Sequence, residues 1–367
     1  MGRPVISDGH TGKPACPDNG TASGAFSLGL VVLALFALLG LTLGGSAAAY
    51  DPYTGDIYVV SVAGGARHAL TDAPEQEYFP ALSPNGRRIA YVRDAEPDPQ
   101  VWLMNADGRG QHQLSFSAGE KLRPVWSPNG QRLAFMVWNR SLCEPEIVLW
   151  CPFTDIWTVN ADGSGERKLL DHAMQPAWSR DGRRLLFQDF EAYTPGTARA
   201  LKVARADGSS VRTIFRGPME QAFRSPPAWS PDGKRIAFGT TTPSLEHRVL
   251  VVNADGSGRR RLAAGLYAAW GPGGKTIALE QDAGVFVRPL ARGRVHRVGG
   301  RTGFGGSCPT WSPDGKRLAL LTSANLSIVR PDGRGRKQLA SSALCQLNMF
   351  PSPPAWSRDG KRIYFAG

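Results

Sequence analysis

The sequence predicts an all-β protein: a seven-bladed β-propeller in which each blade is a four-stranded antiparallel sheet. Three observations support this fold class. A turn motif recurs seven times, a second strand pair recurs between its copies, and the two ends of the repeat region carry complementary halves of one blade. A repeat of this length is typical of propeller blades.

The first recurring element is a Trp-Ser-Pro-Asp-Gly motif, followed by Lys or Arg and an apolar run. Successive copies lie about 41 to 52 residues apart, a spacing that suits four strands and their turns. The tryptophans recur at one position of the repeat, so we assign them to packing between neighbouring blades. The copies are Leu82–Gly86, Trp126–Gly130, Trp178–Gly182, Trp229–Gly233, Trp270–Gly274, Trp311–Gly315 and Trp356–Gly360.

The second recurring element is an apolar strand that mostly runs into an Asn-Ala-Asp-Gly type of turn. Asp-Gly between two apolar runs is a strong hairpin signal, because glycine accepts the positive φ that tight turns need. Each repeat is therefore predicted to be two hairpins. These strands begin at Asp56, Gln100, Asp155, Ala200, Arg248, Gly284 and Leu326.

The ends of the repeat region predict how the ring closes. The region begins with the second hairpin of a blade (Asp56–Leu70) and finishes with a first hairpin (Pro354–Gly367). Neither half can bury its apolar face alone, so we expect the N-terminal half to pair with the C-terminal half in one composite blade, which leaves few exposed sheet edges. The predicted propeller spans residues 50–367.

The repeat also carries a resemblance to a known family. Residues Pro227–Phe238 read Pro-Ala-Trp-Ser-Pro-Asp-Gly-Lys-Arg-Ile-Ala-Phe, which resembles the TolB-like β-propeller repeat, a WD-like repeat of exported bacterial proteins. The resemblance extends over nearly all of residues 55–367. It implies a cell-envelope scaffold or a protein-interaction role. The TolB propeller itself has six blades and an additional N-terminal domain, so the resemblance concerns the repeat family.

Two segments precede the predicted propeller. Residues 1–25 are polar and rich in small residues, and we expect them to be disordered. Residues 26–43 are an uninterrupted apolar run, and Ala47 and Ala49 form an Ala-x-Ala site within the segment 26–49. This pattern indicates either a cleaved signal peptide or a retained signal anchor. In both cases the propeller is exported, to the periplasm, the cell surface or the medium, and contacts the membrane only through an uncleaved segment.

Four cysteines of the propeller region form two plausible pairs. Cys143 and Cys151 flank an insertion within one blade, and Cys308 and Cys345 each lie just before a first strand in successive blades. Two such pairs suggest disulfides in an oxidising compartment, and four unrelated reduced cysteines are the alternative.

The two faces of the ring differ in charge. The face with the short turns carries most of the cations behind the formal net charge of +12. These cations either attract anionic polymers or lipid headgroups, or merely keep the turns solvated. The opposite face carries long loops and much of the acid, and we predict recognition there because binding residues favour variable loops on a rigid scaffold. The candidate contacts are Trp138, Glu144, Glu146, Trp150, Glu191, Glu220, Glu246 and His247.

The sequence contains no nucleophile elbow, zinc-binding His-Glu-x-x-His motif or phosphate-binding loop. Some TolB-like propellers resemble metal-dependent oligogalacturonate lyases, so a metal held by His172 and His247 is the alternative to a site without metal. Export and the lack of an aromatic stacking platform argue against nucleic acid. We therefore expect an exported, monomeric, non-enzymatic scaffold without a cofactor, which binds a protein or a cell-envelope polymer. A metal-dependent polysaccharide (uronate) lyase or hydrolase is the second hypothesis.

Overall fold

A computed structural model describes most of the predicted propeller. The described residues are 55–139, 154–189, 199–217, 226–242, 244, 246–265, 267–281, 283–299, 308–322, 325–341, 346–347 and 350–367. The predicted segments 1–25 and 26–49 lie outside them. Within these ranges no helix is long and apolar enough to cross a membrane.

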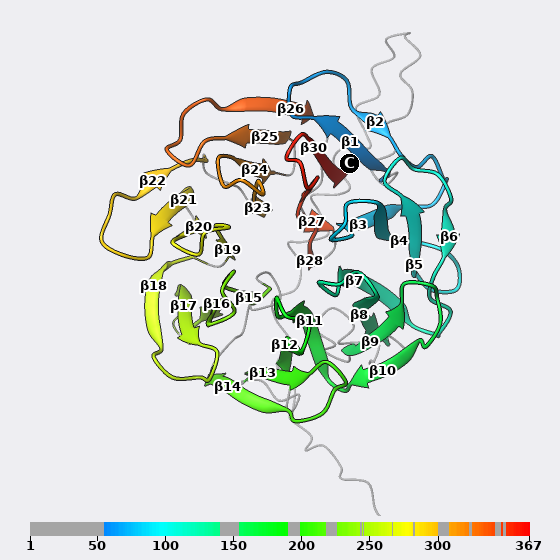
Figure 1. The fold of residues 1–367 in the computed structure, drawn as a ribbon, viewed down its shortest axis with the longest axis horizontal. Helices are drawn as coiled ribbons and strands as arrows, with labels where there is room; N and C mark the ends of the chain where they lie inside the picture. Colours follow the sequence, from blue (N-terminus) through cyan, green and yellow to red (C-terminus); the bar gives the residue numbers. More distant parts are fainter. Residues whose placement is uncertain are drawn as a thin grey trace, which may run out of the picture. The chain divides into compact units, whose positions relative to one another are not determined.

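The described strands form seven four-stranded antiparallel sheets around a centre, and this confirms the predicted fold class (Figure 1). The first three sheets along the chain are β3 (Glu77–Leu82), β4 (Arg88–Arg93), β5 (Gln100–Asn105), β6 (His112–Gln113); β7 (Glu120–Trp126), β8 (Arg132–Trp138), β9 (Thr154–Asn160), β10 (Arg167–Leu170); and β11 (Ala173–Trp178), β12 (Arg184–Asp189), β13 (Arg199–Arg205), β14 (Arg212–Gly217).

The next three sheets follow the same order. They are β15 (Ala228–Trp229), β16 (Arg235–Thr241), β17 (His247–Asn253), β18 (Arg260–Ala264); β19 (Tyr267–Trp270), β20 (Thr276–Gln281), β21 (Gly284–Pro289), β22 (His296–Arg297); and β23 (Cys308–Trp311), β24 (Leu318–Leu321), β25 (Asn325–Val329), β26 (Lys337–Ser341). The first strand of each sheet lies nearest the centre (Figure 1). A two-stranded sheet, β27 (Gln346–Leu347) with β28 (Phe350–Pro351), is inserted before the last sheet.

The last sheet combines the two ends of the repeat region. Its strands are β29 (Ala355–Trp356), β30 (Arg362–Ala366), β1 (Ile57–Ser61) and β2 (His68–Ala69). β1 and β30 pair in antiparallel register from Ile57 opposite Ala366 to Ser61 opposite Arg362. We call this the closing sheet.

The recurring turn has a local physical explanation. In the fourth sheet, the Ser230 hydroxyl donates to the Asp232 carboxylate at 2.5 Å and accepts from the Arg235 backbone N–H at 2.9 Å. Gly233 has a φ of 66°, which glycine adopts without steric cost. The hydrogen bond from Ser230 lowers the pKa of Asp232. The motif therefore recurs because each of these residue types satisfies one requirement of the turn.

The repeat tryptophans join neighbouring sheets. Each indole Nε1 donates to a backbone carbonyl of the preceding blade, so each ring is anchored by a hydrogen bond as well as by packing. The pairs are Trp126 with Ala81, Trp178 with Val125, Trp229 with Ala177, Trp270 with Ala228, Trp311 with Ala269 and Trp356 with Thr310. Leu82 holds the corresponding position in β3 and has no such donor.

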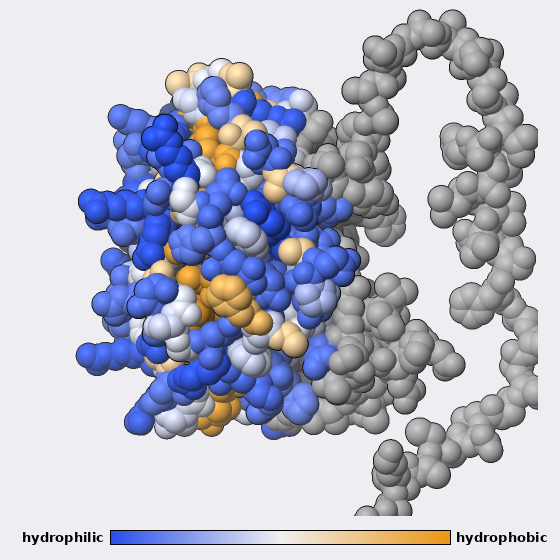
Figure 2. Space-filling view, turned by 90° about the vertical axis from the view of Figure 1, so that its right-hand side faces the viewer, coloured by the Kyte–Doolittle hydropathy of each residue, from blue (hydrophilic) through white to orange (hydrophobic). Residues whose placement is uncertain are grey.

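The outer surface of the ring is mostly hydrophilic on the side that carries β5 and β6, with scattered apolar residues (Figure 2). Among the described residues, the large apolar side chains with high exposure are Phe116 (71%), Val211 (49%) and Val295 (45%). The apolar core lies between the sheets, in clusters that each combine residues of adjacent blades.

Candidate functional site

The predicted recognition residues that the structure describes are Trp138, Glu246 and His247. Trp138 ends β8 and is only 7% exposed, within a core cluster that includes Leu122 and Met136. Its burial fits a packing role. Glu246 is exposed just before β17 and forms an ion pair with Arg248 of that strand at 2.5 Å, so its charge is partly neutralised. Glu144, Glu146, Trp150, Glu191 and Glu220 lie outside the described residues.

The two histidines of the alternative metal site come from different sheets. His172 is exposed in the turn between β10 and β11, where it has a φ of 50°, and its backbone N–H donates to Asp155 Oδ1 at 3.0 Å. His247 is half-buried at the start of β17. Over the described ranges, no three His, Cys, Asp or Glu side chains converge as a metal site would require.

Of the cysteines predicted to pair, only Cys308 is described. It begins β23, is 2% exposed and is bonded through a disulfide. Cys143, Cys151 and Cys345 lie outside the described residues, so both pairings remain predictions.

The cations of the short-turn face divide into two structural classes. In four blades, the arginine that stands two residues after the Asp-Gly or Asn-Gly turn stacks on the repeat tryptophan of the next sheet, which is a cation–π contact. The distances from the guanidinium carbon to the ring centroid are 5.3 Å for Arg88 on Trp126, 5.4 Å for Arg132 on Trp178, 4.8 Å for Arg184 on Trp229 and 5.2 Å for Arg235 on Trp270. These arginines therefore help to join the blades, and an exposed cation directly before them, such as Arg183, carries solvated charge.

The inner strands of the first three sheets share an irregularity close to the centre of the ring. Three residues before the tryptophan position, Phe79, Arg123 and Gln175 adopt a positive φ of 56°, 52° and 53°. At each of them the register with the second strand shifts. All three side chains are buried. Positive φ costs a non-glycine residue about 1–3 kcal/mol, so the surrounding structure must hold these bulges in place.

The seven inner strands surround the centre of the ring, a position that we call the central channel, and Arg123 lies on one of them, β7 (Figure 1). It interacts electrostatically with Tyr267 of β19, although β7 and β19 belong to the second and fifth sheets and lie on opposite sides of the centre (Figure 1). Side chains from opposite inner strands can meet only across the channel. Arg123 is 9% exposed, and its Nη1 has no hydrogen-bond partner among the described residues.

Burial determines the protonation of this pair. It lowers the pKa of Arg123 to about 10 and raises the pKa of Tyr267 to about 12, so at neutral pH a cation faces a neutral phenol. A buried cation without a paired anion is costly. Such a group is suited to bind a carboxylate or phosphate that enters the channel.

An apolar cavity of about 380 Å³ borders Tyr267. Its lining also includes the repeat tryptophans Trp229, Trp270 and Trp311, together with prolines of the same three blades. The tryptophans therefore line a cavity in addition to joining the sheets. Arg123 and Tyr267 did not emerge as candidates from the sequence. The sequence did contain a signal for these two residues: each stands three positions before a repeat tryptophan, in a repeat that is otherwise regular.

The comparisons with known proteins agree with the repeat and with the fold. No family model matches the chain. The Tol-Pal system protein TolB of Anaeromyxobacter dehalogenans is 32% identical over 113 residues, which cover 30% of this chain and 24% of that protein. The chain thus matches about a quarter of the length of this relative.

Two solved structures have a similar fold. TolB from Acinetobacter baumannii has a TM-score of 0.50 at 19% identity and covers 70% of this chain and 64% of its own. An oligogalacturonate lyase in complex with manganese has a TM-score of 0.60 at 14% identity and covers 85% of this chain and 96% of its own. At these identities the likeness concerns the fold alone. The repeat motif, the sequence relatives and the ring of seven sheets together show a β-propeller whose repeats are similar to those of TolB.

Proposed function

We propose that this chain is an exported, non-enzymatic scaffold that binds a protein partner, and that a segment of the partner enters the central channel. The observation that carries the proposal is Arg123, a buried cation on the inner strand β7 whose Nη1 has no hydrogen-bond partner among the described residues. A partner carboxylate would supply the missing anion.

The surroundings of Arg123 support a protein segment as the ligand. The cavity beside Tyr267 is lined by tryptophans and prolines, which suit apolar or aromatic side chains. The curated relative is named a Tol-Pal system protein, which is consistent with a role in an assembly of several proteins. Export is proposed from the apolar segment 26–43 and the Ala-x-Ala site after it.

Site-specific photo-crosslinking in the producing cell tests this proposal. p-Benzoylphenylalanine in place of Tyr267 should capture a partner, because this position faces Arg123 and borders the cavity. The matched control carries the same crosslinker in place of Phe116, which is 71% exposed on the outer surface. Arg123→Met should abolish capture from position 267. Equal capture from both positions, or capture that does not depend on Arg123, would refute channel binding.

The lyase hypothesis predicts a different result from the same protein. Metal analysis would find manganese or calcium, and an oligogalacturonate substrate would be cleaved, with loss of both in His172→Ala and His247→Ala. The binding proposal predicts no turnover at any metal concentration.

A further inference from the structure

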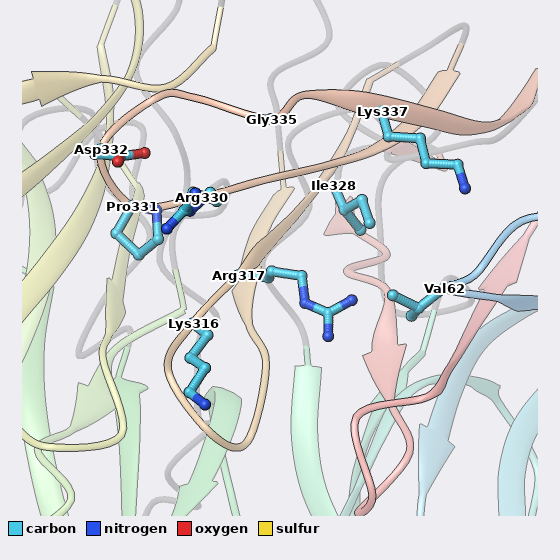
Figure 3. A pocket seen from close by; sticks show the side chains of 9 residues that line it. All are labelled: Val62, Lys316, Arg317, Ile328, Arg330, Pro331, Asp332, Gly335 and Lys337. Carbon is cyan, nitrogen blue, oxygen red and sulfur yellow. The ribbon is translucent and has the colours of Figure 1, made fainter.

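A second concave site lies between the sixth sheet and the closing sheet, at the short-turn face. It has a volume of about 720 Å³. Its lining residues are Val62, Lys316, Arg317, Ile328, Arg330, Pro331, Asp332, Gly335 and Lys337 (Figure 3). Val62 and Ile328 are buried and form an apolar floor, while four cations and one acid form the walls. We call this site the seam pocket.

The other blades carry an arginine at the same position as Arg317, so their contacts can be compared with those in the seam pocket. Arg317 holds the position that Arg88, Arg132, Arg184 and Arg235 hold in other blades, where each of these arginines stacks on the next tryptophan. Arg88 also donates to the Ala161 carbonyl of the next sheet at 2.9 Å. Trp356 is present in the closing sheet, yet the Arg317 guanidinium has no hydrogen bond, ion pair or ring contact within the described ranges. Its side chain extends toward Val62 instead (Figure 3).

The closing sheet also lacks an acid at the position that faces this arginine. In the second sheet, Asp162 follows Ala161 in the turn. The hydrogen bonds from Ser164 mainly lower the pKa of Asp162, and Arg88 of the preceding sheet lowers it slightly further. The turn of the closing sheet has the same backbone hydrogen bond, from Gly64 to Ser61, but Ala63 stands in place of the aspartate. The positive charge of the sixth sheet therefore meets no carboxylate in this turn.

The remaining cations surround the same space. Lys337 of β26 donates to the Ala63 carbonyl at 2.5 Å and so spans the seam. Lys316 and Arg330 are exposed, and Arg330 attracts Asp332, the one acid of the lining. Four cations against one acid give the lining a formal charge of +3.

We propose that the seam pocket binds a phosphate-bearing ligand. Two guanidinium groups, Arg317 and Arg330, can each bind a phosphate through two parallel hydrogen bonds, and the lysines add point charges. The apolar floor would accommodate the carbon skeleton that carries the phosphate. The phosphate comes either from a soluble molecule or from a lipid headgroup, and the proposal does not depend on the channel site.

Titration calorimetry with inorganic pyrophosphate at pH 7.5 and low salt tests the proposal. Arg317→Gln combined with Arg330→Gln should weaken pyrophosphate binding by about tenfold or more, the loss expected for about 1.4 kcal/mol. The matched control is Arg183→Gln with Lys234→Gln, which removes the same charge from exposed turn residues of other blades and should change the affinity less than about twofold. Lys316→Gln alone should give an intermediate loss.

Flotation with phosphatidylglycerol vesicles distinguishes the two sources of phosphate. Vesicle binding that is lost in the Arg317 and Arg330 variant but kept in the control variant would support a lipid headgroup. Pyrophosphate binding without vesicle binding would support a soluble ligand. Absence of binding to both probes, or equal weakening in the two double variants, would overturn the proposal, because equal weakening indicates only the summed field of the basic face.

Discussion

The indole Nε1 of Trp126 donates a hydrogen bond to the carbonyl oxygen of Ala81, 45 residues earlier in the chain, at 2.9 Å. The guanidinium of Arg88 stacks on the same ring, with its carbon 5.3 Å from the ring centroid. One side chain thus joins the first two sheets through a hydrogen bond, a cation–π contact and apolar packing.

Trp126→Phe should therefore destabilise the ring. The substitution leaves the Ala81 carbonyl without this donor and weakens the stacking of Arg88, so we expect the free energy of unfolding to fall by about 1–2 kcal/mol. Urea denaturation measures this change. Trp157→Phe is the matched control, because the Trp157 Nε1 is buried and has no hydrogen-bond partner among the described residues. Equal losses in the two variants would show that the indole hydrogen bond contributes little.

Arg123→Met should abolish capture of the partner without lowering the stability of the protein. The substitution removes a buried charge that has no paired anion among the described residues, so the free energy of unfolding should rise by about 0–3 kcal/mol. Arg88→Met removes a guanidinium that is stacked and hydrogen-bonded, and it should lower stability. Thermal and urea denaturation compare the two. A strong loss of stability in Arg123→Met would mean that this arginine has a structural partner.

The buried side chain of Lys121 should make the free energy of unfolding depend on pH in the alkaline range. Its side chain is fully buried, and Nζ donates to the carbonyls of Ser117 and Gly119. Burial lowers the pKa of Lys121 from 10.5 to about 8. Between pH 8 and pH 10 the unfolded chain therefore binds more protons at this site than the folded protein does, so the free energy of unfolding rises with pH.

The comparison that isolates Lys121 is the wild type against Lys121→Met at pH 8 and at pH 10. The difference in unfolding free energy should shift by about 2 kcal/mol in favour of the wild type at the higher pH. Other titrating groups are common to both proteins and cancel. A difference that stays constant over this range would mean that Lys121 keeps an ordinary pKa.

Closure of the ring can be tested at Phe365. This ring is fully buried in β30 and stacks on Tyr58 of β1 at a centroid distance of 5.8 Å. Phe365→Ala should lower the free energy of unfolding by about 3–5 kcal/mol, because it leaves a cavity between the two ends of the repeat region. Phe116→Ala removes the same side chain from an exposed site and should change stability by less than about 0.5 kcal/mol. Similar values for both would contradict a packed closing sheet.

By itself, the sequence was sufficient to predict the blades, because the physics of each blade is local. Ser230, Asp232 and Gly233 specify their turn within four residues. The same turn motif, with apolar strands on each side, recurs seven times in the sequence. The packing role of the repeat tryptophans followed from the same regularity.

The tertiary structure decided the candidate sites, because they depend on residues that are distant in the chain. Arg123 and Tyr267 lie 144 positions apart in the chain, and they interact only because the ring brings two inner strands of distant sheets near each other. The seam pocket likewise depends on Ala63, which replaces an acid at the point where the two ends of the repeat region adjoin. Turn chemistry acts over a few residues, whereas burial and charge balance depend on every blade that packs around a side chain.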